Sequence, residues 1–404
     1  MAEKTAIIIY VLSHVVSAIY MLFNRVYIGE AKGITILDLD NFVIFGWLLV
    51  ITLGYIFMYG FYRVTRNKKP RLSIMPSKII INREKAHIFI FVLVIAQLLF
   101  SSITGVGKVG SNSTSSYSFI FSFFRVESVF LFYYLCCREK KKIFVINSAL
   151  FFIYRLSLGW TWFIFQYAII ELFIYFRKNP RKYKFSNIKL LFYPTALLLI
   201  GAKAYQYFYQ LKFYIRLNTW GFKLDYFDSL TALTNRFSFF PLSVSVFQNL
   251  DRIKSLYNEE NILFKEVLGM FRPLVPGFLM PNKLFRPMNN VFVQAIHYDI
   301  TPITSSPVGI FSYIIALFYS DFLSGIVWFL LLLLLFILVS SIIKALETEK
   351  GSLDIVYFFL IFEIYNVATL EQVYSYGYLS VFYLAPFLYL LGIIKNERRE
   401  KYEV

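Results

Sequence analysis

Long apolar runs alternate with short polar connections along most of the chain. A helix that crosses a membrane needs about 20 mostly apolar residues, and we interpret ten apolar runs as spans, two of them short. A shorter apolar helix is predicted at 308–320. The pattern predicts an all-α polytopic integral membrane protein with about 10–12 transmembrane helices. The ten predicted spans are 5–23, 41–62, 88–106, 117–137, 143–154, 160–176, 188–206, 322–343, 353–370 and 376–394.

Two of these spans, 143–154 and 160–176, are too short for two full crossings. They are predicted to form a hairpin of tilted or partial helices. The first span begins four residues from the N-terminus, and no small-residue cleavage site accompanies it. We interpret it as a retained helix rather than a signal peptide.

One long connection, residues 207–307, interrupts the apolar pattern. Its ten Lys/Arg and seven Asp/Glu residues indicate a mixed, water-facing surface. Its seven prolines favour short helices and extended segments over a large sheet. The predicted organisation is therefore an N-terminal transmembrane bundle at 1–206, a loop subdomain at 207–307 and C-terminal transmembrane helices at 308–404.

Composition excludes several classes of protein. Apolar residues make up 58% of the chain and charged residues 16%, against roughly 45–50% and 25% in soluble domains. This excludes a soluble globular enzyme, a disordered protein, a coiled coil and a disulfide scaffold. The only cysteines, Cys136 and Cys137, are adjacent, so neither a disulfide framework nor a zinc site is encoded. We expect no metal and no cofactor.

The formal net charge of +17 is concentrated in every second connection. Basic residues cluster at 63–87, 138–142 and 177–184 and again after 394. The positive-inside rule places these connections and both termini in the cytoplasm. The 207–307 loop then lies on the external side. We interpret the basic clusters as topology signals and contacts with anionic membrane lipids rather than nucleic-acid contacts.

Three histidines are candidates for chemistry. His14 falls inside the first span, where packing is expected, and His87 at the cytoplasmic end of the third span, where an interfacial position is expected. His297 lies where the external loop rejoins the membrane. It is a candidate general base or phosphate ligand. Asp299 either orients His297 or serves as the base itself.

Isolated cations are the second group of candidates. Arg155 stands alone in the break between two apolar stretches, and Lys203 lies near the outer end of its span. Arg125 and Glu127 fall inside the fourth span on different helix faces, so each needs a partner elsewhere. An interhelical salt bridge and a substrate cavity both remain open for this pair.

The external loop adds Arg236, Arg272 and Arg286. Arginine is the preferred bidentate partner of phosphate, so with Arg155 they form a candidate site for an anionic lipid headgroup such as a diphosphate. The sequence contains no Walker-type Gly-x4-Gly-Lys-Ser/Thr phosphate loop and no Gly-x-Ser-x-Gly elbow. ATP-driven transport is therefore disfavoured, and we expect no metal-dependent transferase.

The chain resembles the O-antigen and capsule repeat-unit polymerases (Wzy type), with the O-antigen ligases as related proteins. The resemblance rests on the solitary Arg155 in a short hairpin and on one large loop before the last spans. It also rests on the loop exit, Tyr298-Asp-Ile-Thr-Pro-Ile-Thr-Ser-Ser-Pro-Val-Gly309, and the later Asp321-Phe-Leu-Ser-Gly325. The His-Asn pair of the ligases is absent, because Tyr298 follows His297.

The resemblance implies a membrane glycosyltransferase of GT-C-like architecture in the bacterial inner membrane. It implies polymerisation of undecaprenyl-diphosphate-linked oligosaccharide units into surface polysaccharide at the outer face, without a metal, and a chain-length regulator as partner protein. In this reading His297, Asp299 and Arg155 are catalytic. Substrate binding would fall to Arg236, Arg272, Arg286, Lys203 and Arg125. The alternatives are an O-antigen ligase, a flippase for the same lipid-linked unit, or a scaffold protein. The long loop disfavours the flippase. The charged residues Arg125 and Glu127 in the fourth span disfavour the scaffold protein.

Overall fold

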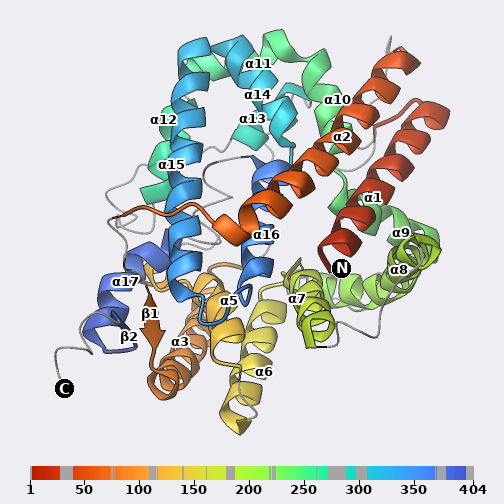
Figure 1. Cartoon of the computed structure of the whole chain (residues 1–404). Helices are drawn as coiled ribbons and strands as arrows, with labels where there is room; N and C mark the ends of the chain where they lie inside the picture. The colour runs from red at the N-terminus through yellow and green to blue at the C-terminus, as the bar shows by residue number, and fades with distance from the viewer. Residues whose placement is uncertain are drawn as a thin grey trace.

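The structure of the protein is a computed structural model in which helices dominate (Figure 1). Its described residues are 2–27, 40–73, 76, 78–108, 115, 117–138, 141–160, 162–178, 187–217, 220, 224–260, 262–271, 288–296, 307–368, 370 and 379–396.

Five stretches of described helix are long and apolar enough to cross a membrane. Their many exposed apolar side chains, such as Phe23, Phe57 and Ile103, suit contact with lipid tails. The sequence prediction of a helical membrane protein is confirmed at this level. The five stretches are α1 (Ala2–Asn24), α2 (Asn41–Thr65) with the 3-10 turn η2 (Arg66–Lys68), α3 (Arg83–Thr104), α4 (Ser118–Phe123) with α5 (Val126–Cys136), and α15 (Phe322–Leu346).

The other predicted spans are also helical, but most are short. At a rise of 1.5 Å per residue, a helix of 17 residues reaches only about 26 Å, less than the roughly 30 Å of a bilayer core. The hairpin predicted at 143–176 is one pair of them. These helices are α6 (Lys142–Ser157), α7 (Trp162–Lys178), α8 (Asn187–Leu217), α16 (Asp354–Val367) and α17 (Leu379–Leu390).

Short helices fill the described part of the region predicted as the external loop, and none of its described residues joins a sheet. Helix α10 is buried from Phe240 to Val246, because it packs against α1, α2 and α14. Helices α10, α11, α13 and α14 lie together at the top of Figure 1. Their bounds are α9 (Tyr226–Phe237), α10 (Phe240–Gln248), α11 (Leu250–Glu260), α12 (Ile262–Phe271), α13 (Met288–Ile296) and α14 (Ile310–Ser320).

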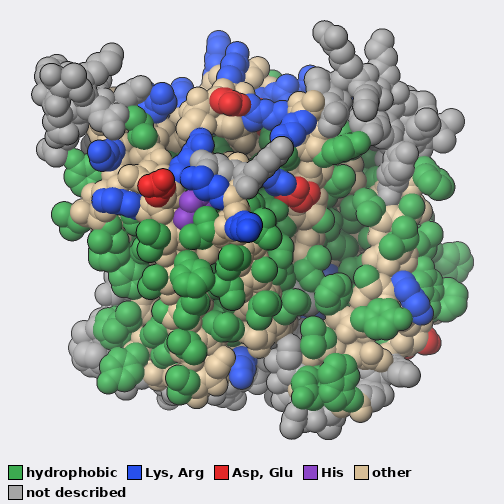
Figure 2. Space-filling view, turned by 90° about the horizontal axis from the view of Figure 1, so that it is seen from below, with side chains coloured by type: hydrophobic (Ala, Val, Ile, Leu, Met, Phe, Trp, Pro, Cys, Tyr) green, Lys and Arg blue, Asp and Glu red, His purple; other side chains and the backbone are tan. Residues whose placement is uncertain are grey.

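The basic connections meet at the opposite end of the bundle. The Nζ atom of Lys69 lies 3.1 Å from Oε1 of Glu347 and 2.6 Å from Oδ1 of Asp354. Strand β1 (Ile79–Ile81) pairs antiparallel with β2 (Ile394–Asn396). Figure 2 shows Lys and Arg side chains crowding part of the lower face, with hydrophobic side chains over much of the rest. If the basic connections share a cytoplasmic side, their Lys and Arg side chains must gather at one end in this way. The assignment of this end to the cytoplasm stays a prediction.

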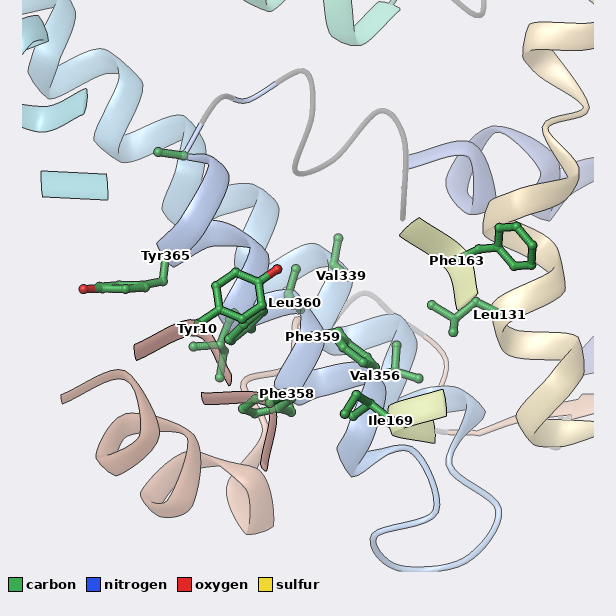
Figure 3. Close-up of a cluster of buried hydrophobic side chains, with 14 of the residues drawn as sticks. Tyr10, Leu131, Phe163, Ile169, Val339, Val356, Phe358, Phe359, Leu360 and Tyr365 are labelled. Carbon is green, nitrogen blue, oxygen red and sulfur yellow. The ribbon is translucent and has the colours of Figure 1, made fainter. Parts of the chain in front are cut away.

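The centre of the core is α16, whose residues Ile355–Leu360 are at most 1% exposed. Tyr10 of α1 packs on this helix with its ring 4.7 Å from that of Phe362, and Figure 3 shows it beside Leu360. Close approach around α16 also needs glycine. A Cβ atom on Gly54 of α2 would lie 2.6 Å from the ring of Phe311.

A substitution at Gly309, the residue just before α14, tests this packing. Its φ of +83° is in the region that favours glycine, and an added Cβ would lie 2.6 Å from Cδ2 of Phe239 and closer still to Cε2. Backbone strain and overpacking together should cost Gly309→Ala about 2–4 kcal/mol of unfolding free energy. Thermal unfolding in detergent measures this. Gly46→Ala is the matched control, because nothing lies within 4 Å of its added Cβ. Equal unfolding temperatures of the two variants would contradict the prediction.

Candidate functional site

The helix that the sequence predicts at 117–137 is broken. Phe124 and Arg125 leave helical geometry between α4 and α5, with ψ of 42° and 110°. A helix break leaves backbone carbonyl groups without their helical hydrogen bonds, and lipid tails have no donor to replace them. Here Gln97 of α3 satisfies two of them, because its Nε2 donates to the carbonyls of Phe121 at 2.9 Å and Phe124 at 3.2 Å. Arg125 therefore sits at a helix break, and Glu127 in the first turn of α5.

Arg155, in the last turn of α6, is the partner of Glu127. Its Nη1 donates to Oε1 of the Glu127 carboxylate, and both side chains are largely buried, at 15% and 23% exposure. The guanidinium also lies 5.6 Å from the ring of Trp160, a cation–π contact. For Glu127, this is the interhelical salt bridge that the sequence left open.

One donor of Arg155 is left over. Its Nε is buried and has no hydrogen-bond partner within the described ranges. A buried donor without a partner is costly in an apolar setting. Arg155 lies thirteen residues beyond Lys142, so it stands about 20 Å from the basic end of the bundle along α6. The ion pair therefore lies well away from the basic end of the bundle.

A second polar cluster connects helices α1, α2 and α16 to Ser238, which lies between α9 and α10. His14 is fully buried; its Nδ1 lies 3.0 Å from the hydroxyl of Ser238, and its Nε2 lies 3.2 Å from that of Tyr55. The Tyr55 hydroxyl donates to Oδ1 of Asn366. The carbonyl of Asn366 in turn accepts from the amide of Gly309 at 2.9 Å. The packing role predicted for His14 is confirmed.

His87 departs from its predicted interfacial position. It is only 2% exposed, and its Nδ1 lies 2.7 Å from the hydroxyl of Tyr133. The side-chain amide of Asn147 donates to the same hydroxyl at 2.9 Å and to the His87 carbonyl at 2.9 Å. Packing of α5 and α6 over the first turns of α3 covers this histidine, which a one-dimensional hydropathy pattern does not reveal.

The structure brings Arg155 and Glu127 together, and the roles of the other predicted site residues stay untested. Arg236, in the last turn of α9, and Lys203, on α8, are exposed. Arg272, Arg286, His297 and Asp299 lie outside the described residues. Their assignment to a diphosphate and sugar site stays a prediction.

Gln97, Glu266 and Glu363 were not predicted as candidates. Gln97 closes the helix break. Glu266 of α12 is 1% exposed and accepts from the hydroxyl of Tyr313 at 2.5 Å. Glu363 interrupts the apolar run of α16. The available signal for Glu363 was a lone carboxyl between apolar neighbours, the pattern expected of a functional residue in a membrane span.

Metal ligands do not gather in the part of the chain that the structure describes, since no three His, Cys, Asp or Glu side chains there could hold an ion. Cys136 and Cys137 are free thiols. No protein-family model matches the chain, and no match is found among curated proteins or solved structures.

Proposed function

We propose that this protein polymerises undecaprenyl-diphosphate-linked oligosaccharide units into O-antigen or capsule polysaccharide at the outer face of the bacterial inner membrane. The observation that carries the proposal is Arg155, a solitary arginine in a helical hairpin, held by Glu127 and retaining a buried donor without a partner. The resemblance in layout to repeat-unit polymerases, with a GT-C-like architecture, is part of the same proposal.

The chemistry needs a cation where the lipid diphosphate departs. In the reaction, the bond between the growing glycan and its diphosphate breaks, and a hydroxyl of the incoming lipid-linked unit forms the new glycosidic bond. Negative charge develops on the diphosphate, so a preorganised guanidinium lowers the barrier. Glu127 occupies Nη1 of Arg155 and leaves the Nε donor for a phosphate oxygen. Arg125, at the break between α4 and α5, is the second cation near this ion pair.

The acceptor hydroxyl must also lose a proton, and we assign this to His297 or Asp299. If His297 is the base, His297→Gln should insert at the normal level but lower the polymerisation rate about 10²–10⁴-fold. Gel analysis of the surface polysaccharide measures this as single repeat units in place of long chains. If Asp299 is the base, Asp299→Asn has that effect and His297→Gln keeps long polysaccharide. Normal polysaccharide from both variants would remove the pair from the mechanism.

Transport of the same lipid-linked unit is the second candidate, favoured by Glu363, a lone carboxyl among the apolar residues of the second half of α16. The sidedness of accumulated lipid in cells lacking the gene separates the functions. A missing polymerase leaves single lipid-linked units at the outer face, and a missing flippase leaves them at the cytoplasmic face. A missing ligase leaves finished polysaccharide on its lipid carrier. Accumulation at the cytoplasmic face would overturn the polymerase proposal.

A further inference from the structure

Glu363 lies in the second half of α16, four residues before its last residue, Val367. It is nine residues beyond Asp354, the first residue of α16, so it stands about 14 Å from that end along the helix axis. Its neighbours on α16 are deeply buried, with Phe362 1% and Tyr365 5% exposed. The side chain of Glu363 is itself only half-buried. Glu363 is therefore less buried than these two neighbours, on a helix that is mostly core.

No hydrogen bond or ion pair holds the Glu363 carboxyl within the described residues. In this it differs from Glu127 and Glu266. Glu127 accepts from Arg155, and Glu266 accepts from Tyr313. A carboxylate without a cation is very unfavourable in a medium of low polarity, whereas the neutral acid is tolerated. Glu363 therefore has a physical reason to carry a proton.

Among the described residues, the titratable groups near this part of α16 are tyrosines and one histidine. From α1, Tyr10 interacts electrostatically with it, and His14 lies next to Tyr10, with the ring centroids 6.5 Å apart. From α2, the ring of Tyr55 lies 6.2 Å from that of Phe362. The charged residues of α1, α2 and α15 are confined to their end turns, and α14 has none. These terminal charges are Glu3, Lys4, Arg63 and Lys344.

We propose that Glu363 is a proton-binding site inside the transmembrane bundle, protonated when the surrounding water is acidic and able to exchange its proton with that water. The class of ligand is the proton itself. Larger cations require several oxygen ligands, and no group of three His, Cys, Asp or Glu residues gathers in the described ranges. The inference stands apart from the polymerase reaction, because it concerns a different helix and uses no substrate.

An apolar carbodiimide, dicyclohexylcarbodiimide, tests the site directly. The protonated carboxyl adds across one C=N bond of the reagent, with its proton moving to nitrogen, and the O-acylisourea formed rearranges to a stable N-acylurea. The ionised carboxylate does not start this reaction. We expect the full-length protein in detergent to gain one adduct, located by peptide mass spectrometry at Glu363. Each pH unit above the midpoint should slow labelling about tenfold, as the acid fraction falls.

Two variants make the result specific. Glu363→Gln should lose the adduct completely, and Glu266→Gln, which removes a buried carboxyl that already has a partner, should keep it. The wild-type experiment needs neither variant to fold, since the adduct is located by sequence. A missing adduct at Glu363 in acid, or labelling there that does not change with pH, would overturn the proposal. Neither outcome bears on polymerisation, which the lipid and polysaccharide assays measure separately.

Discussion

Arg155→Ala is expected to abolish long polysaccharide while single lipid-linked repeat units accumulate. If the guanidinium stabilises the departing diphosphate, its loss should lower the rate about 10²–10³-fold, the effect of removing one well-placed donor from a developing anion. Arg155→Lys should recover little, because an ammonium group lacks the planar fork that binds phosphate through two donors. Gel analysis of surface polysaccharide at matched protein level measures both variants.

The experiment must separate binding from folding, because Arg155→Ala also strips Glu127 of its partner. The double variant Arg155→Leu/Glu127→Leu removes both charges, so its stability should return close to that of the wild type. It should still make no polymer. Arg138→Ala is the matched control, since it breaks an ion pair with Glu171 at the basic end. If the double variant makes long polysaccharide, Arg155 has only a structural role.

Lys69→Met should be the most destabilising single substitution at the basic end. The Lys69 ammonium is 3% exposed and bridges Glu347 and Asp354. Its removal leaves two carboxylates facing each other with little water, which typically costs about 3–5 kcal/mol. Thermal unfolding in detergent should show a large drop in the unfolding temperature at neutral pH.

A compensating variant checks the cause. Adding Glu347→Gln and Asp354→Asn to Lys69→Met removes the uncompensated charges, so much of the lost stability should return. Arg177→Met is a milder control, because its partner Glu349 is 81% exposed and exposed pairs contribute about 0–1 kcal/mol. A Lys69→Met protein as stable as the Arg177→Met protein would show that the cluster does not stabilise the end of the bundle.

The apolar periodicity was sufficient to predict the helices themselves. Helix α14 was predicted at 308–320 and spans Ile310–Ser320, and α2 was predicted at 41–62 and spans Asn41–Thr65. Runs of about 20 apolar residues have few folded alternatives, because every backbone group must be bonded internally. The number of full-length spans was harder to predict, since α16 and α17 are shorter than a bilayer core.

The polar pairing was only partly predictable. The sequence indicated that Glu127 needed a partner elsewhere but did not identify Arg155, because an ion pair between helices depends on their crossing and rotation. The break at Arg125 gave no Pro or Gly signal, since Phe124 precedes it and Val126 follows it. Gln97 stabilises that break from another helix, a tertiary contact that local propensity cannot predict.

The pairing of β1 with β2 has a consequence for biosynthesis. Ile79 pairs with Asn396, and the carbonyl of Ile393 accepts from the amide of Asn82. Almost the whole chain must leave the ribosome between the two strands, so this contact has a very high sequence separation and forms late. Until then, the backbone groups of β1 have no partner strand and must be satisfied by water or lipid headgroups. The basic end therefore closes only after insertion of the intervening helices, and a ribosome that stalls before residue 394 leaves a bundle with an open sheet edge.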